Sequence, residues 1–229
     1  MKNTHLLTAI LCILPFLQAA AQIPSSPNSL DAAGERDGQW TLLFDREMKP
    51  VKDAGSAAYY SVINYRKGKI EGTARTYFMS GAKMSEITYA NGIMEGLAVG
   101  WFESGGKEFE TPYKAGVPDG KETVWFPTGQ KRTEVTYKNG KEDGIQTEWY
   151  PGGAKKSEIP YKNGQIDGIA TRWYESGAKQ TIIPHKAGKM NGTRIDWHEN
   201  GKKKSEIRYK NGKRVGSPIN WDESGKKLM

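Results

Sequence analysis

Apolar and polar residues alternate with a period of two along most of the chain, in short runs separated by turn residues. In one stretch, alternation over 145–150 is followed by a Pro-Gly-Gly-Ala turn and a second alternating run over 155–161. Alternation of this kind is typical of half-buried β-strands. Asn-Gly pairs such as Asn163-Gly164 separate successive stretches, and they are strong hairpin signals because both residues tolerate a positive φ. The pattern predicts β-hairpins, and no segment after residue 21 has a sustained helical period.

The hairpin pattern recurs every 24 residues without a slip in register. An aromatic column keeps this interval at Tyr77, Trp101, Trp125, Trp149, Trp173, Trp197 and Trp221. A glycine series keeps it at Gly68, Gly92, Gly116, Gly140, Gly164, Gly188 and Gly212. Stacked repeats bury side chains against their neighbours and extend in one direction. We therefore expect an all-β protein, an elongated single twisted antiparallel sheet of tandem 24-residue β-hairpin repeats.

The alternation also predicts how side chains divide between the two sheet faces. Thr147 and Trp149 share one face, and we expect Ile159 and Tyr161 of the returning strand to join them. This tryptophan-bearing face is the more apolar and is expected to be the better packed. The opposite face is predicted to carry an aromatic and an acidic column: Phe102, Phe126, Tyr150 and Tyr174, with Glu110, Glu134 and Glu158.

The two ends of the chain depart from the repeat. Residues 1–21 have the features of an export signal, with Lys2, an apolar stretch over 6–17 and an alanine-rich cleavage site. Three further segments are predicted: a flexible leader at 22–33, an atypical first repeat with an insertion at 34–67, and regular 24-residue repeats at 68–229. The signal predicts an exported protein, periplasmic, secreted or at the cell surface after cleavage near Ala21-Gln22.

Little in the sequence supports catalysis or metal binding. The single cysteine, Cys12, lies within the predicted signal, so the mature chain has no thiol. His185 and His198 occupy slots of aromatic columns, and no G-x-S-x-G, Walker or H-E-x-x-H pattern is present. Equivalent glutamates of successive hairpins are expected about 10 Å apart, too far to share one ion. We expect no enzyme activity, no metal and no cofactor.

The net charge of +8 favours anionic partners, but its distribution leaves two interpretations open. A lysine column follows the hairpin turns, and Lys107, Lys131, Lys155 and Lys179 form a candidate basic stripe for an anionic glycan or lipid headgroup. Alternatively, these lysines only keep sheet edges and turns soluble. Nucleic acid is not an expected partner, because acidic residues are interleaved with the basic ones. No segment after the signal is apolar enough to span a membrane.

One unit, DGIQTEWYPGGAKKSEIPYKNGQIDG, closely resembles the bacterial MORN-variant repeat, written loosely as G-x-W-x-x-Y-x-x-G-x-x-x-x-x-x-x-Y-x-x-G-x-x-x-G. The resemblance extends over nearly all of the chain after the signal. It implies a ribbon of antiparallel hairpins and brings no catalytic motif. Proteins of this kind are often labelled antitoxin components of toxin–antitoxin systems, which would imply a protein partner. MORN proteins more widely are linked with membrane lipids and protein scaffolding.

Regular spacing makes the column of Phe102, Phe126, Tyr150 and Tyr174 the strongest candidate binding surface. Its rings are suited to stacking on sugars or to gripping an extended peptide, and simple packing along the ribbon also accounts for them. The first functional hypothesis is an exported scaffold that binds a protein partner through one long sheet face, with an antitoxin-like or immunity-like role as one form. The alternative is a module that binds cell-surface glycans or lipid headgroups.

Overall fold

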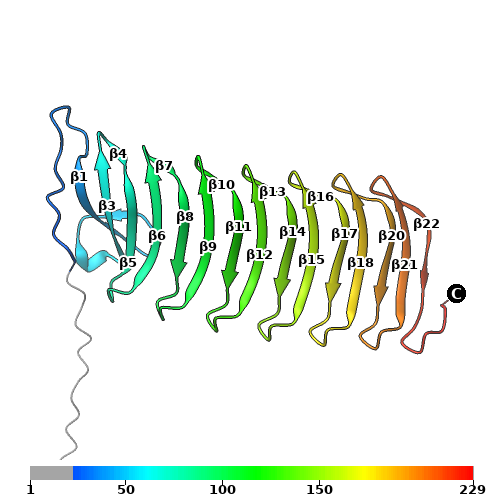
Figure 1. Cartoon of the computed structure of the whole chain (residues 1–229). Coiled ribbons are helices and arrows are strands. Elements are labelled where there is room, and N and C mark those ends of the chain that lie inside the picture. Colours follow the sequence, from blue (N-terminus) through cyan, green and yellow to red (C-terminus); the bar gives the residue numbers. More distant parts are fainter. Residues whose placement is uncertain (1–22, 229) are drawn as a thin grey trace, which may run out of the picture.

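The computed structural model describes residues 23–228 and confirms the predicted fold class. These residues form one open antiparallel sheet of 22 strands, built from hairpin repeats stacked along one direction (Figure 1). The predicted export signal at 1–21, with Cys12, lies outside the described residues. Within 23–228, no helix is long and apolar enough to cross a membrane.

Each repeat contributes one outgoing and one returning long strand. The outgoing strands are β1 (Gly38–Phe44), β5 (Gly72–Phe78), β8 (Gly96–Trp101), β11 (Gly120–Trp125), β14 (Gly144–Trp149), β17 (Gly168–Trp173) and β20 (Gly192–Trp197). The returning strands are β3 (Tyr59–Arg66), β6 (Lys83–Ala90), β9 (Lys107–Lys114), β12 (Lys131–Lys138), β15 (Lys155–Lys162), β18 (Lys179–Lys186) and β21 (Lys203–Lys210). The final strand is β22 (Lys213–Asn220).

Tight turns join the returning strand of one repeat to the next repeat. After the turn, the chain first forms a two-residue strand: β4 (Lys69–Ile70), β7 (Ile93–Met94), β10 (Val117–Pro118), β13 (Lys141–Glu142), β16 (Gln165–Ile166) and β19 (Lys189–Met190). At a typical turn, both Asn91 (φ 53°) and Gly92 (φ 80°) are left-handed, as a type I′ hairpin requires. The Glu71 carboxylate accepts a 2.8 Å hydrogen bond from the Asn91 amide, so this turn also rests on the preceding repeat.

The predicted division of side chains between the two faces holds for the outgoing strands but is wrong for the returning strands, and a β-bulge is the reason. In the β14–β15 hairpin, Trp149 pairs with Lys155 but Glu148 pairs with Ser157, so Lys156 is an extra residue. One inserted residue reverses which face every later side chain of the strand occupies. Thr147 therefore lies opposite Glu158, and Ile159 lies on the other face. The same shift recurs in the other regular hairpins.

The sheet consequently has a tryptophan face and a tyrosine face. The tryptophan face carries the tryptophan column together with Glu86, Glu110, Glu134, Glu158 and Glu206. The tyrosine face carries Tyr89, Tyr113, Tyr137, Tyr161 and Tyr209, with His185 in the same column. Most of the buried residues in the regular repeats lie on the tyrosine face: Ala98, Thr111, Val135, Ser157, Ala170 and Thr181. The better-packed face is therefore the tyrosine face, contrary to the sequence-based expectation.

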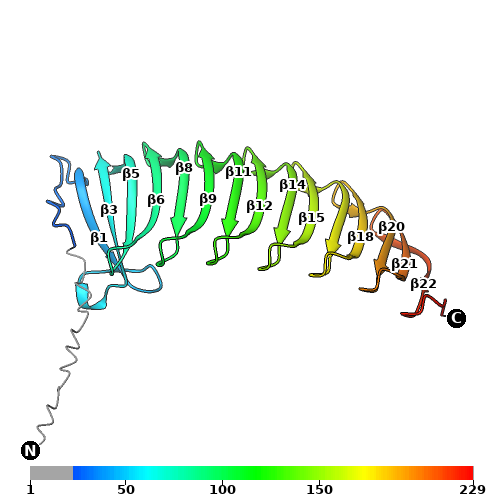
Figure 2. The same ribbon diagram turned by 60° about the horizontal axis from the view of Figure 1, so that its bottom comes forward.

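The atypical first repeat replaces a tight turn with a longer excursion. Between β1 and β3 the chain forms β2 (Pro50–Val51), which pairs with the end of β1, and a short 3-10 helix, η1 (Ala54–Ser56). Figure 2 shows this excursion beside the edge of the arched ribbon where the outgoing strands end. The described part of the predicted leader lies against β1, where Asn28 Oδ1 accepts a 2.9 Å hydrogen bond from the Thr41 amide.

The far end of the ribbon is also partly covered. The Leu228 amide donates a 2.8 Å hydrogen bond to the Asn220 carbonyl at the end of β22. Pro218, within the same strand, has no backbone N–H to offer a further strand. Both outer strands therefore have part of their pairing capacity blocked.

Candidate binding groove

Three adjoining hollows lie on the tyrosine face, near the edge where the outgoing strands end. Their volumes are about 240, 190 and 420 Å³. The first two share Glu148, Tyr150 and Lys156, and the second and third share Arg172 and Gln180. Because neighbouring hollows have walls in common, they form one groove that crosses the strands from β12 to β21. We call it the aromatic groove.

Three of the four aromatic candidates lie along this groove, one in each successive repeat. Phe126 and Tyr150 line the first hollow, and Tyr174 lines the largest. Phe102 is half-buried at the equivalent position one repeat earlier and does not line these hollows. The column begins earlier than predicted, because Phe78 occupies the same position and packs edge-to-face on Tyr59 with ring centroids 5.8 Å apart.

The groove tyrosines also tie one repeat to the next. The Tyr150 hydroxyl donates a 2.9 Å hydrogen bond to the Trp173 carbonyl, and the Tyr174 hydroxyl donates a 2.8 Å bond to the Trp197 carbonyl. The His198 imidazole lies 3.0 Å from the Trp221 carbonyl in the same arrangement. The hydroxyls of Tyr150 and Tyr174 are therefore already bonded within the fold, and only their rings are available to a ligand.

The candidate basic stripe lies on the tryptophan face, and most of it is neutralised. Lys107, Lys131 and Lys155 each form an ion pair with the glutamate three residues later. Lys107 and Lys131 also lie over the tryptophan of the next repeat, 5.6 and 5.9 Å from the ring centroids. Lys179 has no such acid, because Ile182 takes the glutamate position. A lysine held between a carboxylate and an aromatic ring attracts a polyanion weakly, so this column favours a structural role.

The aromatic groove is the more strongly basic surface. Its walls carry five cations and two carboxylates: Arg132, Lys156, Arg172, Arg194 and Lys204, with Glu148 and Asp196. Both carboxylates have partners within the fold. Lys156 Nζ lies 3.7 Å from Glu148, and Arg194 lies 2.9 Å from Asp196. The cations Arg132, Arg172 and Lys204 form no ion pair with any described residue.

Asp196 is held by the densest polar network of the groove. Burial raises the pKa of its carboxyl, but hydrogen bonds from Ser205, Thr181 and Arg194 outweigh burial and leave the pKa below its usual value. The Ser205 hydroxyl lies 2.6 Å from Oδ2 of Asp196. These bonds keep Asp196 ionised and oriented toward the protein, so it does not cancel the unpaired cations.

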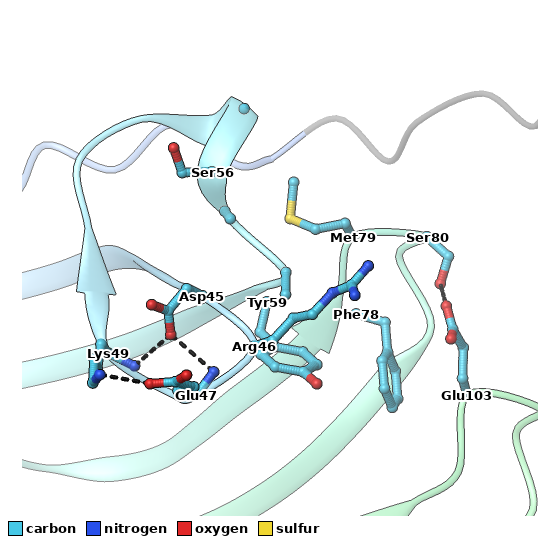
Figure 3. Close-up of a pocket in the computed structure, with 13 residues that line it drawn as sticks. Asp45, Arg46, Glu47, Lys49, Ser56, Tyr59, Phe78, Met79, Ser80 and Glu103 are labelled. Atoms are coloured by element: carbon cyan, nitrogen blue, oxygen red, sulfur yellow. Dashed lines mark hydrogen bonds and ion pairs between the residues drawn. The ribbon is translucent and has the colours of Figure 1, made fainter.

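A larger hollow of about 930 Å³ lies beside the insertion of the first repeat. Figure 3 shows the Arg46 side chain extending toward Phe78 and Met79, with Tyr59 behind it. Asp45 and Glu47 hold the turn of the insertion, where the Asp45 carboxylate accepts backbone hydrogen bonds and Glu47 pairs with Lys49. Among residues 23–228 no cluster of three histidine, cysteine, aspartate or glutamate side chains is arranged to hold a metal ion.

Comparison with known families supports the repeat assignment. Three segments match the MORN repeat variant. They are residues 118–139, 142–163 and 190–211. These MORN-variant segments contain much of the groove wall, including Phe126, Tyr150 and Lys204. No curated protein matches the chain.

Proposed function

We propose that the protein is an exported, non-catalytic repeat scaffold that binds a protein partner through the aromatic groove. The observation that carries this proposal is the continuity of the groove, because its three hollows cross successive repeats without a break. A scaffold of this kind offers a long, shallow surface rather than an enclosed pocket. Long shallow surfaces suit extended polypeptides better than small molecules, which need deep concave sites.

The chemistry of the groove favours a polypeptide over a glycan or a lipid surface. Guanidinium and ammonium groups alternate there with half-buried rings such as Tyr150 and Tyr174. A polypeptide can complement both, with carboxylates for the cations and apolar side chains for the rings. Sugar binding would also draw on the tyrosine hydroxyls, but these are already bonded to carbonyls. The largely neutralised lysine column gives little support to a lipid-headgroup surface.

The sequence supports a cellular compartment for this binding outside the cytoplasm. The export signal predicted at 1–21 would direct the scaffold to the periplasm, the cell surface or the medium. The partner would then be an exported or envelope protein. An antitoxin-like or immunity-like role, which the MORN-variant resemblance implies, is one form that such binding would take.

The proposal is tested by blocking the groove with one bulky residue. Gln180 is shared by two hollows, so Gln180→Trp fills the groove where they join. The matched control is Ile169→Trp on the tryptophan face, where Ile169 is 56% exposed. In affinity capture from cell-envelope and medium fractions, a discrete protein should be retained by the parent and the control and lost from Gln180→Trp. Retention of only glycan or lipid, or equal retention by both variants, would overturn the proposal.

A further inference from the structure

We propose that the partner segment bound in the aromatic groove is an acidic, extended polypeptide with an acidic residue at every fourth position. This inference rests on the proposed function and names the chemistry of the partner. It is carried by three unpaired cations in the groove wall, which lie on strands separated by equal numbers of strand-to-strand steps: Arg132, Arg172 and Lys204.

Along the row of residues that the groove follows, cations first appear at β12. At the bulge position of successive returning strands, the residues are Met84, Glu108, Arg132, Lys156, Gln180 and Lys204. The second position facing the groove is Gly100, Val124, Glu148, Arg172 and Asp196 in successive repeats, so it supplies one cation, Arg172, between two carboxylates. At these two positions the earlier repeats have no cation, whereas the later repeats have Arg132, Lys156, Arg172 and Lys204. An acidic segment is therefore complementary to β12–β21 and not to the whole ribbon.

The spacing of the unpaired cations fits an extended chain. Arg132 lies on β12, Arg172 on β17 and Lys204 on β21, so each interval spans three strand-to-strand steps. With strands about 4.8 Å apart, each interval is about 14 Å, and four residues of β-strand also cover about 14 Å. Side chains four apart on a strand point to the same side. A strand lying along the groove would therefore present residues i, i+4 and i+8 to the three cations.

The intervening groove surface explains why a uniform polyanion is a poorer fit. Between the unpaired cations lie the carboxyl groups of Glu148 and Asp196, each already paired with a neighbouring cation. Added negative charge opposite these carboxylates would be repelled. A partner with acids at the three cation positions and apolar or small polar residues between them avoids this repulsion. Those intervening side chains would contact the rings of Tyr150 and Tyr174.

The test measures binding of three fluorescent peptides of equal length to the full chain by anisotropy. One carries glutamates at i, i+4 and i+8 in a Ser/Val background, the second has the same composition with the glutamates adjacent, and the third replaces glutamate with lysine. We expect the spaced peptide to bind at least about tenfold more tightly than the clustered one, and the basic peptide to show no binding. The affinity should fall as salt is raised, because the contacts are charged.

Two triple variants with the same change in net charge locate the site. Arg132→Gln, Arg172→Gln and Lys204→Gln together should weaken the spaced peptide at least about tenfold. The control combines Lys141→Gln, Lys189→Gln and Lys213→Gln, three exposed lysines just after the tight turns, and should change the affinity less than about twofold. Both variants keep the aromatic rings and the inter-repeat hydrogen bonds, so both should fold.

Each contrary result has a separate meaning. Equal binding of spaced and clustered peptides, or an equal loss in the control variant, would refute the inferred acidic pattern. If acidic peptides fail to bind while a captured protein is still lost from Gln180→Trp, the acidic-segment inference fails and the proposed scaffold function stands. If only a polyanionic glycan such as heparin binds, with no polypeptide captured, both are refuted.

Discussion

The pair formed by Gly100 and Phe109 provides a sharp test of how the tyrosine face is packed. The two residues lie opposite each other in the β8–β9 hairpin. A β-carbon built on Gly100 would overlap Cε1 of the Phe109 ring and lie 2.8 Å from Cζ. The ring therefore occupies the volume that a side chain at position 100 would need. One repeat later, the equivalent pair is Val124 and Thr133.

This comparison predicts that the two positions are strongly coupled. Gly100→Val alone should cost about 1–3 kcal/mol of unfolding free energy, because it overpacks a filled site. Phe109→Thr alone should cost about 2 kcal/mol, roughly half the penalty of removing a fully buried phenylalanine, since Phe109 is half-buried. The double variant installs the pair found in the next repeat. It should recover to within about 1 kcal/mol of the parent, a coupling energy of about 2–4 kcal/mol.

Urea unfolding of the four proteins provides the measurement, followed by tryptophan fluorescence and by far-UV circular dichroism. Coincident transitions with an unchanged m-value are required before the midpoints are converted into free energies. If the two single effects simply add in the double variant, Phe109 does not fill the space left by Gly100, and this account of the packing is refuted.

Three further predictions concern the links between repeats, the turns and the charge network. Tyr150→Phe should lower stability by about 0.5–1.5 kcal/mol in urea unfolding, because it removes the hydrogen bond to the Trp173 carbonyl; an unchanged midpoint would mean that this bond contributes nothing. Ala115, at φ 50°, occupies a position filled by asparagine in most other turns, so Ala115→Asn should raise the unfolding free energy by about 0.5–1 kcal/mol, and a loss of stability would contradict this. Hydrogen bonds hold the pKa of Asp196 below its usual value, so its stabilising contribution is present above about pH 4 and is lost as the pH falls through the lowered pKa. The stability difference between the parent and Asp196→Asn should therefore shrink in thermal unfolding between pH 5 and pH 2, and a difference independent of pH would refute this assignment.

The repeat architecture was predictable because its determinants are local and occur many times. A turn such as Asn91-Gly92 needs only residues that accept a positive φ, and these are visible in the sequence. The assignment of the returning-strand side chains to the two sheet faces was not predictable in the same way. The bulge at Lys156 depends on how the turn that follows Trp149 closes, and simple alternation has no term for an unpaired residue. One such residue per hairpin was enough to exchange the predicted positions of Glu158 and Ile159.

The binding groove was predictable only in part, for a related reason. Three of its aromatic residues belong to a column that the 24-residue interval reveals, as Phe126 does. The cations that line it recur only in part, since Arg132, Lys156 and Lys204 share one repeat position that holds Met84, Glu108 or Gln180 in other repeats. Arg172 occupies a position held by glycine, valine or glutamate in the three preceding repeats, so periodicity treats it as variation. Residues that depart from the repeat consensus, once assigned to the correct face of the sheet, are the signal that would have identified the basic wall of the groove.

The blocked outer strands have a consequence for how such a ribbon behaves in concentrated solution. An open sheet of repeating hairpins is a natural template for its own growth, since each unpaired edge can accept the edge of another molecule. Here Asn28 already accepts a hydrogen bond from the backbone of the outermost strand β1. At the other end, β22 has fewer free backbone donors and acceptors, because Pro218 has no N–H and the Asn220 carbonyl is bonded to Leu228. The hairpins therefore stack within one molecule, and the outer strands are poor partners for the strands of a second molecule. This disfavours linear polymerisation of the ribbon while its two broad faces stay open to other molecules.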